Sequence, residues 1–443
     1  MLSLKERLAA LKESRALGSD LPAAEPAAGG SPPRPVVQSR GEPAAAASSP
    51  VAGPRFDLAD LVPGEEVETP FGRCFHRVIR FPVEHCQGCH ALADALSVPP
   101  EVGGRLARPR LPGLDFRRAI FLDTETTGLS GGTGTYVFLV GFGHFSGEEF
   151  LLHQYFLRHH GEETALLWAV GEALRPFPYL VTFNGRRFDW PLLETRFTCA
   201  RLRSHLPAVA HVDLLYPSWN LWRQRLGSCR LGNLEGAILA APRHDDVPGE
   251  LIPGLYFNYL RTGDARPLVP VLEHNLLDLL SLVSLTAAVG HRLAYPGSRA
   301  APEDLLAVGR FYEREGEEAV AACCYREAAA GGAGCREALY RLAAIAKRQG
   351  DYRAAEESLL RLADEYESLE ALVELAKLYE HRFASLDRAR ECTERALALV
   401  RRRAQLYGRQ ASAALAELRH RHERLLRKLA KGSSPAPGSV QIQ

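Results

Sequence analysis

Three apolar segments of strand length, separated by glycine-containing turns, constrain the fold of this chain more than any other feature. They read AIFLDTET, TYVFLVGFGHF and EFLLHQYFL and lie between residues 116 and 160. Short apolar runs bounded by turn residues are typical of buried strands in an antiparallel meander. A helical pattern (EETALLWAVGEAL), another apolar strand (YLVTFNG) and a long apolar helix (VPVLEHNLLDLLSLVSLTAAVGHRL) follow. This order predicts an α/β domain with a mixed sheet and flanking helices.

A second pattern, at a step of thirty-four residues, marks the C-terminal part of the chain. Matching positions are Leu305, Leu339 and Val373; Phe311, Ile345 and Tyr379; and Ala321, Ala355 and Ala389. Gly316 and Gly350 fall at the same step, in turns between helices. This is the tetratricopeptide period of paired helices, so we expect an all-α repeat domain. Stacked repeats present an extended surface that suits a protein partner.

The remaining segments differ in composition. Residues 16–55 are dense in Ala, Pro, Gly and Ser and predict a disordered linker, whereas residues 401–431 carry ten Arg or Lys. The basic stretch is either a solvated capping helix or a contact for nucleic acid. We divide the chain into an amphipathic helix (1–15), the linker (16–55), a small leading segment of uncertain fold (56–112), the α/β domain (113–292), the helical repeats (302–400), the basic helix (401–431) and a disordered tail (432–443).

Charge and cysteine content bear on how the protein contacts nucleic acid and on its cellular compartment. The formal net charge is +1, so any contact with nucleic acid must come from local patches. Nine cysteines are scattered along the chain, and the N-terminus has no continuous apolar stretch of the signal-peptide type. We also expect no segment apolar enough to span a bilayer. These features predict a cytoplasmic protein without a membrane partner and with free thiols.

Carboxylates occur at three places where an isolated acid would be costly. Asp123 and Glu125 end an apolar strand and, two residues apart, face the same side. Asp189 follows an apolar strand and a turn, where helix capping is an alternative role. His274 and Asp278 share one face of the apolar helix, where a structural His–Asp pair is the alternative.

Together these four carboxylates suit divalent-metal chemistry. Hard oxygen ligands favour Mg²⁺ or Mn²⁺, and two such ions can activate water and stabilise the leaving oxygen of a phosphodiester. His274 would either orient the attacking water or deprotonate it, because imidazole titrates near neutral pH. The residues therefore predict a metal-dependent nuclease with a nucleic-acid substrate.

The motifs LDTETTGLSGG, TFNGRRFDWPLL and HNLLD resemble, in order, the three exonuclease motifs of the DnaQ-like DEDD superfamily. The wider pattern, including GGTGTYVFLVGFG and RLGSCRLGNLEGAIL, resembles the YprB-like RNase H-like domain proteins. The resemblance implies an RNase H-like fold, 3′ to 5′ exonuclease activity, and metal ligands at Asp123, Glu125, Asp189 and Asp278. It also implies substrate contacts through Thr126, Thr127, Gly128 and Asn184.

One departure concerns His274, which lies four residues before the last aspartate, whereas the family usually places histidine five residues before it. Whether His274 removes a proton or only positions the water is therefore open. The alternative function is a nucleic-acid-binding or scaffold protein that keeps the fold without turnover. Near Cys74, the string Cys86-Gln87-Gly88-Cys89-His90 leaves a zinc site or incidental clustering open. We expect Asp213 and the pair Asp245-Asp246 to be structural.

Overall fold

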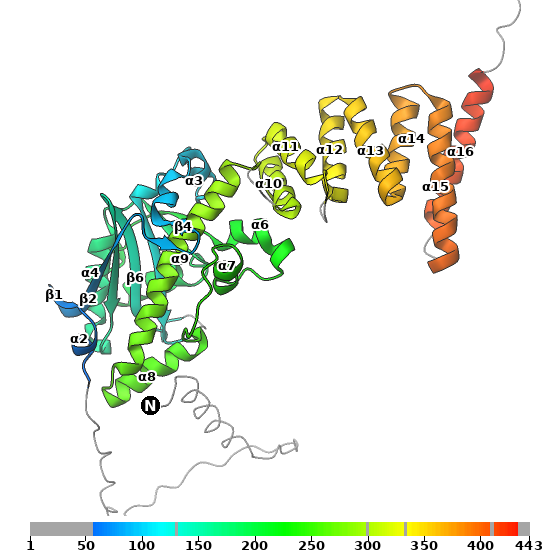
Figure 1. Cartoon of the computed structure of the whole chain (residues 1–443). Coiled ribbons are helices and arrows are strands. Elements are labelled where there is room, and N and C mark those ends of the chain that lie inside the picture. The colour runs from blue at the N-terminus through cyan, green and yellow to red at the C-terminus, as the bar shows by residue number, and fades with distance from the viewer. Residues whose placement is uncertain (1–55, 129–131, 298–300, 332–334, 408–411, 433–443) are drawn as a thin grey trace, which may run out of the picture.

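The computed structural model describes residues 56–128, 132–297, 301–331, 335–407 and 412–432. The predicted opening helix, the linker and the tail beyond residue 432 lie outside these ranges. An α/β domain is followed by an arm of helices that extends away from it (Figure 1). The predicted fold class, a mixed sheet with flanking helices before an all-helical region, is confirmed.

A seven-stranded mixed sheet forms the centre of the α/β domain, in the order β1-β2-β7-β6-β5-β8-β9. β5, β6 and β7 are antiparallel neighbours, as their meander pattern predicted, and β8 and β9 run parallel to β5. The strands are β1 (Glu65–Thr69), β2 (Gly72–Pro82), β5 (Ala119–Thr126), β6 (Val137–Ser146), β7 (Glu149–Phe156), β8 (Tyr179–Thr182) and β9 (Ala210–Asp213).

The leading segment contributes two strands to this sheet. β2 pairs antiparallel with β7, from Phe75 opposite Phe156 to Pro82 opposite Glu149, and β1 pairs with β2. The sheet therefore begins well before residue 113, where our sequence division placed the start of the domain. The short strands β3 (Cys86–Gln87) and β4 (His90–Ala91) form a separate hairpin.

Helices cover both faces of the sheet. Along β5, Phe121 packs in one apolar cluster with residues of α9 (Val269–Ala294), while Ile120 and Leu122 pack in another with residues of α4 (Glu163–Leu174). Neighbouring residues of a strand point to opposite faces, so α9 and α4 lie on opposite sides. Figure 1 shows α9 crossing the front of the sheet.

The other helices of the domain lie around these two layers. They are α2 (Leu58–Leu61), α3 (Pro100–Leu106), α5 (Asp189–Cys199), α6 (Leu215–Leu226), α7 (Leu231–Ala237) and α8 (Ile252–Thr262). Short 3-10 helices precede several of them, including η5 (Gly249–Leu251) before α8 and η6 (Arg266–Leu268) before α9.

The expectation that no segment is apolar enough to cross a bilayer is wrong for one helix. By length and composition alone, residues Arg266–Ala294 could cross a bilayer. Their most apolar window has a mean hydropathy of 1.4. In the structure 67% of that window is buried inside the protein, and α9 packs against β5 and β6. The helix is apolar because it fills the core, so its composition is weak evidence for a membrane.

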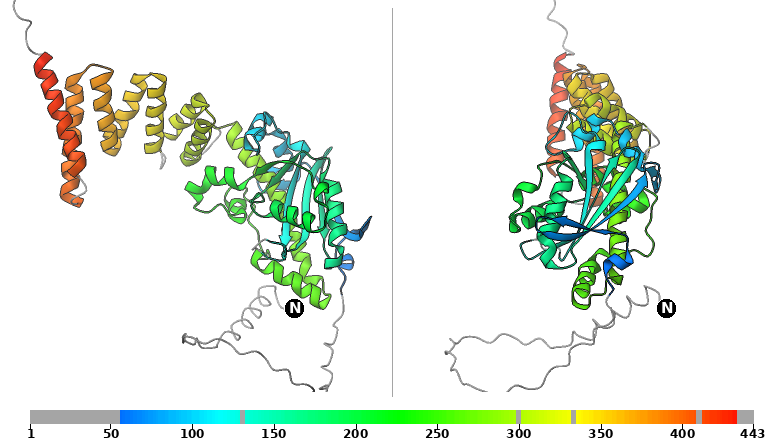
Figure 2. Two further views of the ribbon diagram at one scale, coloured as in Figure 1. Left: turned by 180° about the vertical axis from the view of Figure 1, so that it is seen from behind. Right: turned by 90° about the vertical axis from the view of Figure 1, so that its left-hand side faces the viewer.

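The arm is built from successive antiparallel helices, seen side by side in Figure 2. They are α10 (Pro302–Arg314), α11 (Glu318–Ala328), α12 (Cys335–Gln349), α13 (Tyr352–Tyr366), α14 (Leu369–His381), α15 (Leu386–Tyr407) and α16 (Ser412–Gly432). Ala321, Ala355 and Ala389, which the thirty-four-residue step relates, are all 0% exposed. The arm is consistent with helical repeats, and its assignment as tetratricopeptide repeats stays a prediction.

The predicted basic helix is divided between two helices, because Arg401 to Arg403 belong to the end of α15. Part of its charge holds α16 in place. The buried carboxylate of Glu380 on α14 accepts from Arg424 Nη2 at 2.7 Å and from Lys428 Nζ at 2.7 Å. These contacts support the capping role among the two roles left open by the sequence.

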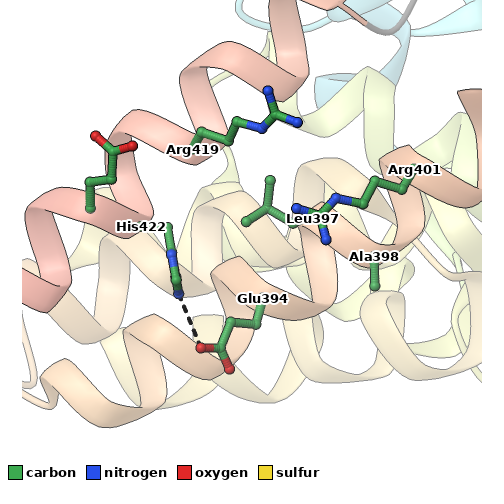
Figure 3. Close-up of a pocket in the computed structure, with 7 residues that line it drawn as sticks. Glu394, Leu397, Ala398, Arg401, Arg419 and His422 are labelled. Atoms are coloured by element: carbon green, nitrogen blue, oxygen red, sulfur yellow. Dashed lines mark hydrogen bonds and ion pairs between the residues drawn. The ribbon is translucent and has the colours of Figure 1, made fainter.

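A small cavity of about 230 Å³ lies between α15 and α16 (Figure 3). One side of it is closed by a hydrogen bond of 3.0 Å between His422 Nε2 and Glu394 Oε1. The lining residues are Glu394, Leu397, Ala398, Arg401, Arg419, His422 and Glu423. None of them belongs to the acidic constellation predicted from the sequence, whose residues lie in the α/β domain.

Candidate active site

The carboxylate of Asp123 points from β5 toward α9. Asn275 Nδ2 donates to Asp123 Oδ2 at 2.9 Å, and Asn275 Oδ1 accepts from Gln154 Nε2 at 3.0 Å. Gly141 lies opposite Asp123 in the sheet, and a Cβ there would meet Asn275 Oδ1 at 2.0 Å. The absent side chain of Gly141 therefore lets the Asn275 amide reach the strand.

Three of the predicted side chains converge between β5 and α9. Glu125, His274 and Asp278 each offer a ligand atom, and these atoms all lie within 4.8 Å of one another. His274 Nε2 is 3.6 Å from Asp278 Oδ2, as expected for side chains one helical turn apart. The structure thus places the acid of the strand beside the histidine and the acid of the helix.

Asp189 reaches the same strand from the other direction. It is the first residue of α5, and its Oδ1 accepts from Thr124 Oγ1 at 2.5 Å. Phe188 occupies the N-cap position, and no side chain caps the helix there. Asp189 is therefore tied to the segment between Asp123 and Glu125, and the alternative role of helix cap is not the one observed.

The pKa values of the acids reflect this crowding. Burial, followed by the charges of Asp278, Asp189 and Glu125, raises the pKa of Asp123 well above its ordinary range. Burial also raises the pKa of Glu125 to about 8, although His274 opposes the shift, and raises the pKa of Asp189 to about 6. Carboxylates that repel one another in this way are stabilised by a proton or a cation.

Arg243 enters the same site from the loop after α7. Its Nη2 donates to Asp278 and to Glu235, and its Nη1 donates to Asp246 Oδ2 at 2.9 Å. Burial lowers the pKa of Arg243, but the charge of Asp278 and the contact with Glu235 outweigh burial and raise it. The guanidinium therefore supplies positive charge inside the acidic cluster.

Asp246 contacts one ring nitrogen of His274, and Asp278 lies near the other. His274 Nδ1 lies 2.8 Å from the Asp246 carboxylate. Burial lowers the pKa of His274, but the hydrogen bond to Asp246 and the charges of Asp278 and Glu125 outweigh it, so the pKa is raised. We expected Asp245-Asp246 to be structural, and the structure places Asp246 in the site. No spacing in PRHDDVPGE signals this contact, because α9 is distant in the chain.

The predicted substrate-binding residues lie in two separate segments, at the end of β5 and after β8. Thr126 Oγ1 donates to Gly128 O at 3.0 Å, and Thr127 Oγ1 accepts from Tyr136 N at 2.9 Å, so both hydroxyls serve the turn after β5. Asn184 has a φ of 64° and its backbone N–H donates to Asp213 Oδ1 at 2.7 Å. Their contact with a nucleotide stays a prediction.

The cysteines and histidines of the leading segment have different surroundings. Cys74 is buried within β2, where burial raises the pKa of its thiol to about 11, while Cys86 and Cys89 are exposed. His90 Nδ1 lies 3.1 Å from Asp94 Oδ2. Among the described residues, the group of Glu125, His274 and Asp278 is the one whose geometry suits a metal ion. The zinc interpretation therefore gains no geometric support.

The donor set of the acidic site fits a divalent cation. It combines carboxylate oxygens with one imidazole, and burial together with the neighbouring acids raises the pKa values of Asp123 and Glu125. Mg²⁺ and Mn²⁺ accept such oxygen ligands. The contact of Arg243 with Asp278 Oδ1 leaves Asp278 Oδ2, which faces His274, as the oxygen nearest the cluster.

Residues 120–289 match the family model of the RNase H superfamily, so this part of the chain is an RNase H superfamily domain. The chain is also homologous to "Uncharacterized protein YprB" of Bacillus subtilis (strain 168), with 34% identity over 215 residues. The match covers 48% of this chain and 52% of that protein, so the chain spans about half the length of this relative.

Proposed function

We propose that this protein is a metal-dependent nuclease that hydrolyses phosphodiester bonds as a 3′ to 5′ exonuclease. One observation carries the proposal: Glu125, His274 and Asp278 offer ligand atoms within 4.8 Å of one another, beside Asp123. The RNase H superfamily domain supports nucleic acid as the substrate class. The polarity rests on the resemblance of the three motifs to DEDD exonucleases.

Asp123, Glu125, Asp189 and Asp278 would hold Mg²⁺ or Mn²⁺. Bound ions of this kind activate water as a nucleophile and stabilise the oxygen that leaves the phosphodiester. Asn275 holds the Asp123 carboxylate through its amide. Thr124 holds Asp189 through its hydroxyl.

His274 positions the attacking water or accepts its proton. The Asp246 carboxylate accepts a hydrogen bond from His274 Nδ1. The other ring nitrogen, Nε2, therefore faces Asp278. Neutral imidazole with a proton on Nδ1 offers Nε2 as an acceptor. Asp246 thus selects the tautomer that a general base requires. Arg243 keeps both Asp246 and Asp278 in place.

The remaining proposals concern the surroundings of this chemistry. Thr126, Thr127, Gly128 and Asn184 would contact the terminal nucleotide, and the helical arm would bind a protein partner. All nine cysteines are free in the structure, which suits the proposed cytoplasmic location. A binding or scaffold protein without turnover remains the competing function, and the test below separates the two.

The test uses the full chain with 5′-labelled single- and double-stranded DNA and RNA in Mg²⁺, Mn²⁺ or EDTA. We expect metal-dependent shortening from the 3′ end, stopped by a 3′ phosphorothioate linkage. Asp123→Asn and Asp278→Asn should lower the rate about a hundredfold or more, because each removes an acid from the metal site. Glu172→Gln on α4, whose carboxylate pairs with Arg175, serves as the matched control.

Two results would count against the nuclease. One is the absence of metal-dependent degradation of all four substrates. The other is equal activity in Asp123→Asn and the wild type, when tryptophan fluorescence shows that both proteins are folded. Retained binding of nucleic acid without any turnover would favour the scaffold function.

A further inference from the structure

Large aromatic side chains are exposed at the residue before Asp189 and on α6. Phe188, which directly precedes Asp189, is 51% exposed, and Tyr216 and Trp219 on α6 are 45% and 47% exposed. Exposing such rings forgoes the burial that normally stabilises them. A cluster of exposed aromatic residues therefore marks a surface that another molecule covers.

The carboxylate of Asp213 joins the two segments that carry these rings. Asp213 accepts from the backbone N–H of Asn184 at 2.7 Å, of Arg186 at 3.2 Å and of Leu215 at 3.1 Å. The first two lie in the turn that leads to Phe188, and the third is the residue before Tyr216. The Asp213 carboxylate therefore holds the turn before Asp189 and the start of α6 next to each other.

The pattern of α6 separates a packed face from an exposed one. Ser218, Leu221 and Trp222 are buried, and α6 packs against α10, the first helix of the arm. Tyr216, Trp219 and Arg223 are spaced by three and four residues, so they share the opposite face. The Arg223 guanidinium lies 4.3 Å from the centroid of the Trp219 ring. The exposed face of α6 thus carries two rings and a cation on one line (helix labelled in Figure 1).

Three exposed arginines lie in the turn and on α6, and the buried Asp213 offsets the charge of Arg186 in part. Arg186, Arg187 and Arg223 are exposed, and within the described ranges none of them forms an ion pair with a carboxylate. Other arginines of the domain do form such pairs, as Arg196 does with Glu163 and Arg225 with Asp304. Unpaired guanidinium groups beside exposed rings suit a partner that has both flat apolar groups and negative charge.

An unpaired nucleic-acid strand has both properties. Its bases offer faces that stack on aromatic side chains, and its phosphates attract arginine. In a duplex the base faces are covered by their neighbours, so the rings would gain little contact. We therefore propose that Phe188, Tyr216 and Trp219 form a base-stacking surface that leads a single strand to the acidic site, with its phosphates bound by Arg186, Arg187 and Arg223.

That the bound strand leads to the acidic site rests on the proposed nuclease function. Binding of the strand can be measured without turnover. The full chain in EDTA is titrated into a fluorescein-labelled 20-nucleotide single strand and into the matching duplex, with anisotropy as the readout. We expect tighter binding of the single strand, weakened about tenfold by Trp219→Ala and by Tyr216→Ala. Trp219→Phe should retain most of the affinity, because it keeps a ring.

Phe257→Ala is the matched control, since Phe257 on α8 is 50% exposed and lies on another helix. Arg223→Gln should weaken binding and reduce its dependence on salt, because one phosphate contact is lost. Equal affinity for strand and duplex would overturn the proposal. So would an effect of Trp219→Ala no larger than that of Phe257→Ala.

The outcomes separate this proposal from the nuclease itself. Metal-dependent degradation with unchanged binding in Trp219→Ala and Tyr216→Ala would leave the nuclease standing and refute the stacking surface. Weakened strand binding without turnover of any substrate would support the stacking surface and refute the nuclease. Tight binding of an acidic protein segment with no affinity for either nucleic acid would refute both.

Discussion

Asn275 connects the packing of α9 to the chemistry of Asp123. Its side chain is fully buried, and its amide both donates to Asp123 and accepts from Gln154. Gln154 also donates to the backbone carbonyl of Leu272 at 2.8 Å. A buried amide with this many partners sets the position of the carboxylate more firmly than solvent would.

Asn275→Ala should therefore reduce both metal affinity and activity. We expect a loss of about 10- to 100-fold, because Asp123 loses the donor that orients it. The variant should also be destabilised by roughly 1–3 kcal/mol, since Gln154 Nε2 loses one of its two acceptors and keeps only the Leu272 carbonyl. Calorimetric Mn²⁺ titration and urea unfolding check the two effects.

Ser284→Ala provides a control on the same helix, because Ser284 is buried and its hydroxyl has no partner in the described structure. Removing that hydroxyl should leave metal affinity unchanged. Similar losses in both variants would show that α9 is merely sensitive to substitution.

A group of histidines on the other face of the sheet predicts how stability depends on pH. His76 Nε2 lies 3.1 Å from His153 Nδ1, and the rings of His144 and His153 stack at 5.3 Å. Burial, together with the neighbouring His76, His144 and Arg80, lowers the pKa of His153 to about 3. The unfolded chain thus binds a proton near pH 6.5 that the folded chain does not.

The stability associated with His153 should be complete above pH 7 and decrease as the pH falls below 6.5. Between pH 7 and pH 5, this group should lower the free energy of unfolding of the wild type by about 2 kcal/mol. His153→Gln should abolish that decrease. All four tryptophans lie in the α/β domain, at positions 168, 190, 219 and 222, so their fluorescence in urea reports its unfolding. The exposed His159→Gln is the control, and an unchanged pH dependence in His153→Gln would contradict the prediction.

The turns within the arm show how the helical elements repeat. Gly316 and Gly350 have φ values of 80° and 77° in the turns of the first two helix pairs. Thirty-four residues after Gly350, Ala384 adopts a φ of 50° in the third. The backbone conformation recurs although the residue type does not, and a side chain in this region costs roughly 1 kcal/mol.

Ala384→Gly should stabilise the pair of α14 and α15 by about 1 kcal/mol, because glycine adopts this conformation without steric cost. Hydrogen–deuterium exchange of these helices in the full chain would show slower exchange. Gly350→Ala should have the opposite effect on α12 and α13. Faster exchange in Ala384→Gly would mean that the lost side chain matters more than the turn.

At the scale of the whole molecule, the junction between the domain and the arm is held by specific contacts. Asp304 on α10 is 3% exposed and accepts from Arg225 Nε at 3.0 Å and from Nη2 at 3.1 Å. Tyr312 Oη donates to the Leu293 carbonyl at the end of α9, at 2.7 Å. The first helix of the arm is therefore held directly against the domain (Figure 2).

Asp304→Asn should loosen this junction, because Arg225 loses its carboxylate partner. Arg225 is one-third exposed, so we expect a modest effect of about 1 kcal/mol on the exchange protection of α10. Small-angle scattering should show a broader distribution of distances between domain and arm. Glu303→Gln, a neighbouring acid in the same turn that forms no ion pair among the described residues, should leave both measurements unchanged.

The amino-acid sequence by itself determined those features that depend on backbone periodicity. Spacings of two and four residues place Asp123 beside Glu125 and His274 beside Asp278, and the thirty-four-residue step relates the helices of the arm. The apolar strands and their order predicted the mixed sheet. These properties are local, so the sequence shows them directly.

Only the tertiary structure decided the contacts between distant segments. The pairing of β2 with β7, the approach of Arg243 and Asp246 to α9, and the amide that reaches Asp123 past Gly141 depend on sheet register and helix position. The exposure of Trp219 beside a buried Trp222 depends on which face of α6 packs against α10. Neither register nor packing has a short-range pattern, because each is set by partners far apart in the chain.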